Sequence, residues 1–594
     1  MNNATLKKSF WKSCTFVALV VCAVTLLLLI GAFTFPTPPL IISEDTTRIT
    51  GPLTAKGRID FLKALEQHIT PPELATDENG YRLFVRQFGD LAEYYTGIGV
   101  ENREFYRLQI YEKLGLDPDI PPTLTLPEHP FAVLKTYYET TENAIPEHYL
   151  DSRAELSAEI LEELWNSPWT LDDFPMLADW TAEIDEPLDA IAAAIAKPVF
   201  FVPLVQYQVS RQTDTTPIAY PSIGNSLLFR RIMRMFSIRA TYRIGQGNID
   251  GFINDRLTLY RLGRLTEQTG LTCYLAAAGI QMTALALPIE ENPAHPLTKE
   301  QICRLLEELD ALPPQTTLQK LYEVDRFWVL SLVQDLQYST PSNLTDWVCL
   351  GGSELLFEIT RYSCDWNIVY RQINEVYDIL KEPHTGEKLR ARLEKAERPW
   401  RLNRLLPMLT SGGRGEIAAD YLISLIVSDI TPENSICRAQ CSENLQRLVL
   451  AMMLYQLENG TLPDENWPSQ ITPYLGAEPE QYFSCSIHPS PAGETRYALV
   501  QYGETIQADS DAFWLVATTT SVPFDKAVIS ADELMVMDRT RIDRKNYFHT
   551  AGRIMDLSGM LAAHRNGAVR WHPWQHITGT GSNGDPESSE QSEQ

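Results

Sequence analysis

The chain has 594 residues, and its 44% apolar and 21% charged side chains are typical of globular protein rather than of a disordered chain. This length exceeds one ordinary domain, so we expect two or three folded units. The formal net charge of −27 repels nucleic-acid phosphates, which argues against nucleic acid as a partner.

One long uncharged segment stands near the N-terminus. Residues 15–35, TFVALVVCAVTLLLLIGAFTF, contain no charge, and a helix of this length spans a hydrocarbon core of about 30 Å. Lys7, Lys8 and Lys12 precede the segment and predict a cytoplasmic N-terminal tail, residues 1–14, with the bulk of the chain extracytoplasmic. A cleaved signal peptide is the alternative, but the long run and the lack of an Ala-x-Ala site favour an uncleaved anchor. The sequence thus predicts a single-pass protein of the cytoplasmic (inner) membrane.

Residues 46–429 have the pattern of a helical array. Helical stripes of ordinary length, such as SRAELSAEILEELW and TKEQICRLLEELDAL, alternate with Pro, Asp and Gly punctuation, and alternating strand patterns are scarce. Two of the stripes flank the turn Gly245-Gln-Gly247, which predicts an αα-hairpin of the tetratricopeptide (TPR) kind. Because no 34-residue period repeats, we expect an irregular TPR-like array, all-α throughout.

A different pattern begins near residue 436. An apolar helix with its core at 448–457 ends at Asn459-Gly460, and from Gly493 the segments become short and β-like, as in TRYALVQY, AFWLVATT and AVRWH. We therefore predict a mainly α protein: a transmembrane helix, the array, and a smaller α+β module at 436–575. The last residues, 579–594, lack apolar side chains and are predicted to be disordered.

Three cysteines fall in this C-terminal module. Cys437 and Cys441 lie one helical turn apart, and Cys485 follows in the same module. A disulfide from Cys485 to either of them is one alternative, and buried thiols are the other. Zinc needs about four ligands, and no second close pair exists in the sequence, so no metal or other cofactor is expected.

No familiar catalytic motif is present. The sequence contains no His-Glu-x-x-His, no phosphate-binding loop and no Gly-x-Ser-x-Gly elbow. His549, His564 and His572 gather near the C-terminus with Asp556, which makes them candidates for a metal or acid–base site. The alternative is a set of surface and turn histidines around a terminal hairpin.

An arginine-rich stripe is the other candidate site. Arg230 and Arg234 belong to a set at helical spacing that also contains Arg231, Arg239 and Arg243. One interpretation is a site for a carboxylate, a phosphate or an acidic partner. The other is a helix whose arginines pair with the carboxylates of this acidic protein.

Two resemblances follow from these segments. NLQRLVLAMMLYQLENGTLP resembles the helix-to-loop signature of type II secretion pseudopilins and related pilin-like proteins, with Tyr455, Gly460 and Pro463 at its Tyr-x-x-x-x-Gly-x-x-Pro positions. The resemblance implies a pilin-like fold for the α+β module, with the apolar helix packed under the strands. No prepilin-peptidase site precedes residue 15, so the module is expected to be soluble and unpolymerised.

The N-terminal half has its own resemblance. TTRITGPLTAKGRIDFLKAL and RATYRIGQGNIDGFINDRLTLYRLGRLTEQTG are similar to an uncharacterised family of single-anchor, helix-rich envelope proteins of planctomycete-type bacteria. That resemblance implies location and architecture, and no activity.

Two functions are carried forward from the sequence. The first is a membrane-anchored protein of the cell envelope that binds a protein partner or acts as a scaffold, because helical arrays build extended binding surfaces. The second is an envelope hydrolase or metal-dependent enzyme that uses the C-terminal His and Asp residues. The lack of any complete catalytic site favours the first.

Overall fold

The fold is given by a computed structural model, which describes only the backbone of the strands. The structure describes residue 26 and the ranges 37–89, 100–140, 160–161, 164–165, 167–205, 219–267, 271–287, 296–338, 364–381, 410–428, 432–461, 463, 467–476, 478–483, 494–501, 514–523, 528–530, 559–564 and 569–573.

Helices make up most of the described chain. In chain order they are α2 (Phe61–Ile69), α3 (Gly80–Phe88), α4 (Val100–Leu114), α5 (Pro130–Thr140), η3 (Pro175–Leu177), α7 (Ala178–Glu183), α8 (Asp185–Ile195), α9 (Ala219–Gly245), α10 (Ile249–Thr266), α11 (Leu271–Ala286), α12 (Lys299–Asp310), α13 (Leu318–Tyr338), α15 (Trp366–Lys381), α17 (Ser411–Ser428), α18 (Pro432–Asn459), α19 (Trp467–Ile471), η8 (Thr472–Tyr474) and η9 (Pro479–Phe483). The helical character predicted for residues 46–429 is confirmed in the described residues.

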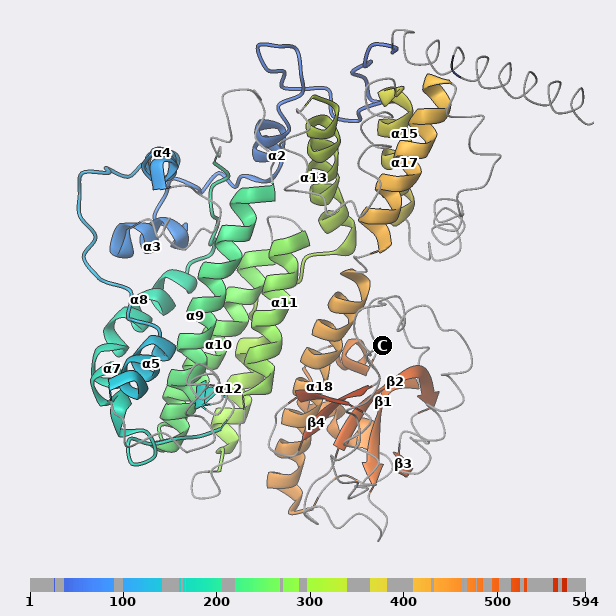
Figure 1. Ribbon diagram of the computed structural model, residues 1–594. Helices are drawn as coiled ribbons and strands as arrows, with labels where there is room; N and C mark the ends of the chain where they lie inside the picture. The colour runs from blue at the N-terminus through green and yellow to red at the C-terminus, as the bar shows by residue number, and fades with distance from the viewer. Residues whose placement is uncertain are drawn as a thin grey trace, which may run out of the picture.

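The helices enclose two apolar cores. In the larger core, α9, α10 and α11 lie side by side, α7 and α8 pack at one flank, and α12 and α18 pack at the other (Figure 1). In the smaller core, α2 packs against α13, and α15 packs between α13 and α17. Burial of apolar side chains in these cores is the main source of stability of the helical body.

Helix α18 belongs to the larger core. All of its residues from Cys441 to Leu450 are buried, as expected for a helix with partners on every side. Polar contacts join it to the array, because Glu443 pairs with Arg264 of α10 and Arg447 pairs with Asp310 of α12. The helix is therefore an integral part of the helical body.

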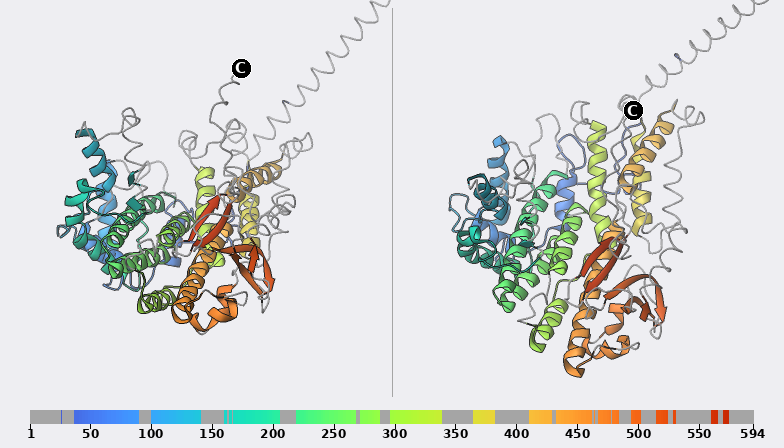
Figure 2. Two further views of the ribbon diagram at one scale, coloured as in Figure 1. Left: turned by 90° about the horizontal axis from the view of Figure 1, so that it is seen from below. Right: turned by 60° about the horizontal axis from the view of Figure 1, so that its bottom comes forward.

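Five short strands form one sheet against α18. They are β1 (Glu494–Gln501), β2 (Trp514–Pro523), β3 (Val528–Ser530), β4 (Gly559–His564) and β5 (Val569–Pro573). The strand order is β3-β1-β2-β4-β5, and β3 pairs with β1 in parallel while the other pairs are antiparallel. Figure 2 shows the strands beside α18 in both views.

The predicted α+β pilin-like module is wrong as a description of this region. The residues whose side chains the structure describes lie in helices and loops and include no β-strand. Leu448, Val449 and Met452 are fully buried, as a pilin-like spine requires. The same helix, however, shares its core and its ion pairs with α10, α11 and α12. Burial of the apolar helix reflects packing within the helical body, and we withdraw the pilin-like fold.

The membrane predictions also need correction. None of the helices that the structure describes is both long and apolar enough to cross a membrane. The predicted anchor at 15–35 falls outside the described residues except for Leu26, as do the predicted tails at 1–14 and 579–594. The predicted transmembrane helix is thus not found among the described helices, and the single-pass, inner-membrane prediction is not carried further.

Candidate functional site

The site is built on the αα-hairpin of α9 and α10. Gly247 has φ +71° in the turn, a conformation that glycine adopts without strain, and the side chain of Asn248 caps α10 by accepting the N–H of Gly251 at 3.0 Å. Gly245 lies against the backbone of Trp169, where a Cβ would meet the carbonyl oxygen at 2.0 Å. Gly247 therefore permits the turn, and Gly245 permits the close contact between the end of α9 and the backbone of Trp169.

We expect Gly245→Ala to lower the free energy of unfolding by about 1–3 kcal/mol, because the new methyl group has to displace backbone. The matched control is Gly279→Ala in α11, where no atom lies within 4 Å of the added Cβ. That control should stabilise the helix by up to about 1 kcal/mol. Urea denaturation of both variants checks the difference, and equal effects would show that the contact with Trp169 is not close.

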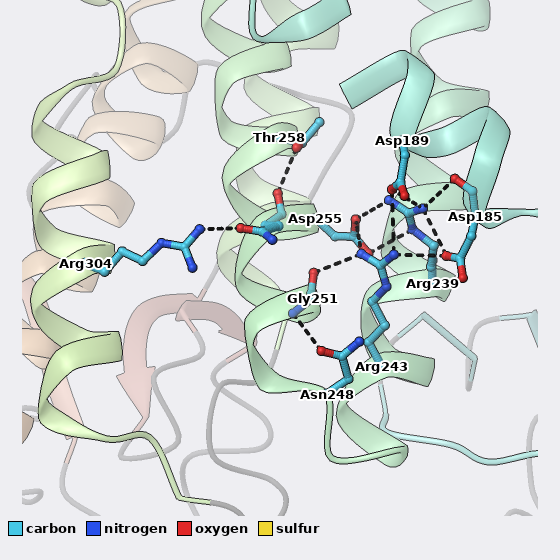
Figure 3. A network of polar contacts seen from close by, with 10 residues as sticks. Asp185, Asp189, Arg239, Arg243, Asn248, Gly251, Asp255, Thr258 and Arg304 are labelled. Atoms are coloured by element: carbon cyan, nitrogen blue, oxygen red, sulfur yellow. Dashed lines mark hydrogen bonds and ion pairs between the residues drawn. The ribbon is translucent and has the colours of Figure 1, made fainter. Parts of the chain in front are cut away.

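A network of two arginines and three aspartates joins α8, α9 and α10 (Figure 3). Arg239 donates from Nε and Nη2 to the two carboxylate oxygens of Asp255, at 3.1 and 2.5 Å, and from Nη1 to Asp189 at 2.8 Å. Arg243 donates to Asp185 at 2.9 Å and lies 3.0 Å from Asp255. Bidentate geometry of this kind fixes both partners in direction as well as distance.

The network is buried at its centre and open at its edge. The side chains of Arg239 and Asp255 are each 2% exposed, whereas those of Asp185 and Asp189 are 63% and 64% exposed. Burial raises the pKa of Asp255 to about 6, and Arg239 opposes that rise. The carboxylate is thus ionised at neutral pH and is held in place by its guanidinium partners.

A groove of about 710 Å³ opens beside the network, between α8, α10 and α12. Ala192 and Ala193 of α8 and Ala196, which follows the helix, form one wall. Asn254 and Thr258 of α10 lie along the floor. Across from them, Arg304 of α12 donates to the Asn254 side chain, and Figure 3 shows it reaching towards α10 from the side opposite Asp185 and Asp189.

The groove is lined by the paired charges of the network and by polar and charged side chains of α10 and α12. The carboxylates of the network are engaged by Arg239 and Arg243, so none is presented as a nucleophile or a base. Among the residues that the structure describes, no three His, Cys, Asp or Glu side chains gather as metal ligands. Along α10 and α12, Thr258 donates to the carbonyl oxygen of Asn254 and Arg304 donates to its side-chain oxygen. The Asn254 amide N–H groups and the other N–H groups of Arg304 can donate to a polar ligand.

The arginines predicted from the helical stripe divide into two groups. Arg230 and Arg234 are exposed near the middle of α9, where Arg234 lies 5.3 Å from the centre of the Trp165 ring. Arg239 and Arg243, further along the helix, pair with the protein's own carboxylates. The pairing interpretation therefore describes the second group, and Arg230 and Arg234 stay candidates for an anion site.

Of the four C-terminal candidates, the structure describes only His564 and His572, and these by their backbone. His549 and Asp556 lie outside the described residues. In the sheet, His572 pairs with Met560, which lies four residues before His564 along β4. The catalytic interpretation of these residues stays a prediction.

The cysteine prediction also stays open. Cys441 is a buried thiol of α18, 8% exposed. Cys485 and the side chain of Cys437 lie outside the described residues.

Sequence reasoning missed the acidic half of the network. Asp185 and Asp189 stand four residues apart in DEPLD at the start of α8, and Asp255 stands in α10. The spacing of the first two places them on one helix face. Nothing local shows that this face packs on Arg239, which is 50 residues away from Asp189.

Comparison with known proteins gives no relative for the chain. No protein-family model, no curated protein and no solved structure matches it. The family resemblances drawn from the sequence are untested by these comparisons, so the function is argued from the groove.

Proposed function

We propose that the chain is a binding protein without a catalytic role and that the groove between α8, α10 and α12 holds an extended segment of a protein partner. The observation that carries the proposal is the open groove beside a rigid arginine–aspartate network. Its volume of about 710 Å³ lies within the range of roughly 300–1,000 Å³ for ligand sites.

The lining favours a peptide as the occupant. A peptide backbone offers alternating N–H and C=O groups, and the floor and far wall supply both donors and acceptors through Asn254, Thr258 and Arg304. The alanine wall leaves room for side chains of the bound segment. The arginine–aspartate network at one end holds the groove in a fixed conformation before binding, and this limits the conformational entropy lost on association.

Closing the groove tests the proposal. Ala193 is exposed on the groove wall, so Ala193→Trp places an indole in the open space without entering the core. Ala182→Trp is the matched control, because Ala182 is exposed on α7 and does not line the groove. Each protein is immobilised and offered a random library of acetylated, amidated hexapeptides.

We expect Ala193→Trp to lower library recovery by about tenfold, which corresponds to about 1.4 kcal/mol of binding. Recovery by the control should match the unchanged protein. Both variants should keep the free energy of unfolding within about 0.5 kcal/mol, because both positions are on the surface. Equal recovery by the two variants would place peptide binding elsewhere or rule it out.

A further inference from the structure

Charged groups of both signs line the groove, namely the carboxylates of Asp189, Asp250, Asp255 and Glu308 and the guanidinium groups of Arg239, Arg243, Arg261 and Arg304. At the network end, Asp189 and Asp255 pair with Arg239 and Arg243. At the other end lies Arg261, six residues beyond Asp255 along α10, which is about 9 Å in a helix. A ligand in the groove therefore meets paired charges at the network end and, further along α10, the guanidinium of Arg261.

Arg261 is held in position without a carboxylate partner. Its Nε donates to the carbonyl oxygen of Ile195 at 2.9 Å, and its Nη2 donates to that of Lys197 at 3.4 Å. Within the described residues, no carboxylate lies within ion-pair distance of this guanidinium. Its side chain is half-buried and lines the groove, so its charge is only partly screened by water.

The neighbouring groups leave that charge uncompensated. Lys197, two residues after the end of α8, adds a second cation that forms no ion pair with the described residues. Glu308 of α12 also lines the groove, but it lies beyond ion-pair distance of Arg261. The two carbonyls at the end of α8 contribute only partial negative charge.

We propose that the peptide bound in the groove carries an acidic side chain that pairs with Arg261. The inference rests on the proposed function and specifies the chemistry of the partner. A planar guanidinium that two carbonyls already orient loses little freedom when it binds a carboxylate. The charge-assisted hydrogen bond gains strength because the site is half-buried.

The competing account is that Arg261 only caps the C-terminal end of α8. A capping role explains the hydrogen bonds from Nε and Nη2 of Arg261, but it assigns Nη1 no role in the groove. The two accounts differ in what the groove selects, so peptide selection separates them.

The experiment uses the full chain and the library of acetylated, amidated hexapeptides, whose ends carry no charge. Enrichment of Asp and Glu among recovered peptides is compared for the unchanged protein, Arg261→Gln, Arg261→Lys and a control, Arg371→Gln. Arg371 is the matched control, because its Nε also donates to a helix carbonyl, that of Asn367 at 3.1 Å, and it lies on α15 away from the groove.

We expect the unchanged protein to enrich acidic residues at one peptide position, and Arg261→Gln to reduce that enrichment by about tenfold. Arg261→Lys keeps the charge and should retain part of the preference, which separates recognition from loss of the α8 cap. Arg371→Gln should select as the unchanged protein does.

Two outcomes overturn the inference in distinguishable ways. Peptides selected without acidic preference, or with a preference that survives in Arg261→Gln, would leave Arg261 as a cap and keep the proposed function. Recovery by the unchanged protein no better than by Ala193→Trp would overturn the proposed function, and the inference with it.

Discussion

Replacing Arg239 by methionine should lower the free energy of unfolding by about 3–5 kcal/mol at pH 7.5. Removal of one partner from a buried ion pair leaves the other charge without compensation, and that loss is large in the interior. Asp255, with its side chain 2% exposed, is the carboxylate that would be left with Arg243 alone. Asp185 and Asp189 are largely exposed and lose little, because water solvates them.

The loss from Arg239→Met should shrink on acidification. Burial raises the pKa of Asp255 to about 6 in the unchanged protein, above that of an unfolded aspartate, so the folded state binds this proton more tightly. A carboxyl of this kind adds stability at low pH, and the contribution disappears as the pH rises through the folded pKa. Without Arg239 that pKa moves higher, so the variant should lose more stability between pH 5 and pH 7.5 than the unchanged protein does.

Urea denaturation at the two pH values measures this effect. Arg86→Met is the control, because Arg86 lies 3.5 Å from Asp77 with both side chains about half or more exposed. Its effect should stay below about 1 kcal/mol at either pH. A loss from Arg239→Met that is equal at pH 5 and pH 7.5 would mean that Asp255 is not the group left unpaired.

The sequence predicted the features that depend on residues adjacent in the chain. Glycines at 245 and 247 mark the turn between α9 and α10, because the backbone conformation at the turn depends on adjacent residues. The arginine stripe was visible as well, together with its pairing interpretation. The particular partners were not, since the packing of α8 on α9 brings together residues about 50 positions apart.

Helix α18 shows why the pilin-like interpretation failed. Glu443 and Arg447 have the spacing of a solvated helix face, and that pattern predicts a helix with water on one side. In the structure both are buried, Glu443 pairs with Arg264, and Arg447 pairs with Asp310 of the array. A charged face that finds buried partners cannot be distinguished from a solvated face by spacing alone, so the second packing surface of α18 was missed.

Leu450→Ala tests that second surface, with an expected loss of about 2–5 kcal/mol in the free energy of unfolding. Leu450 is fully buried and lies one turn beyond Gln446 and Arg447, on the helix face that contacts α10 and α12. Truncation opens a cavity there that the surrounding helices only partly close. Leu457→Ala on the same helix is the control, because Leu457 is 55% exposed and its loss should stay near 0.5 kcal/mol.

Hydrogen exchange locates the effect of Leu450→Ala. Because α18 shares the core of the helical body, amide exchange should rise in α11 and α12 as well as in α18. If α18 were instead the spine of a separate module, faster exchange would be confined to α18 and the strands, and α11 and α12 would keep their protection. Leu457→Ala should leave exchange unchanged in all of these elements, so a rise in α11 that is specific to Leu450→Ala identifies α18 as a structural helix of the array.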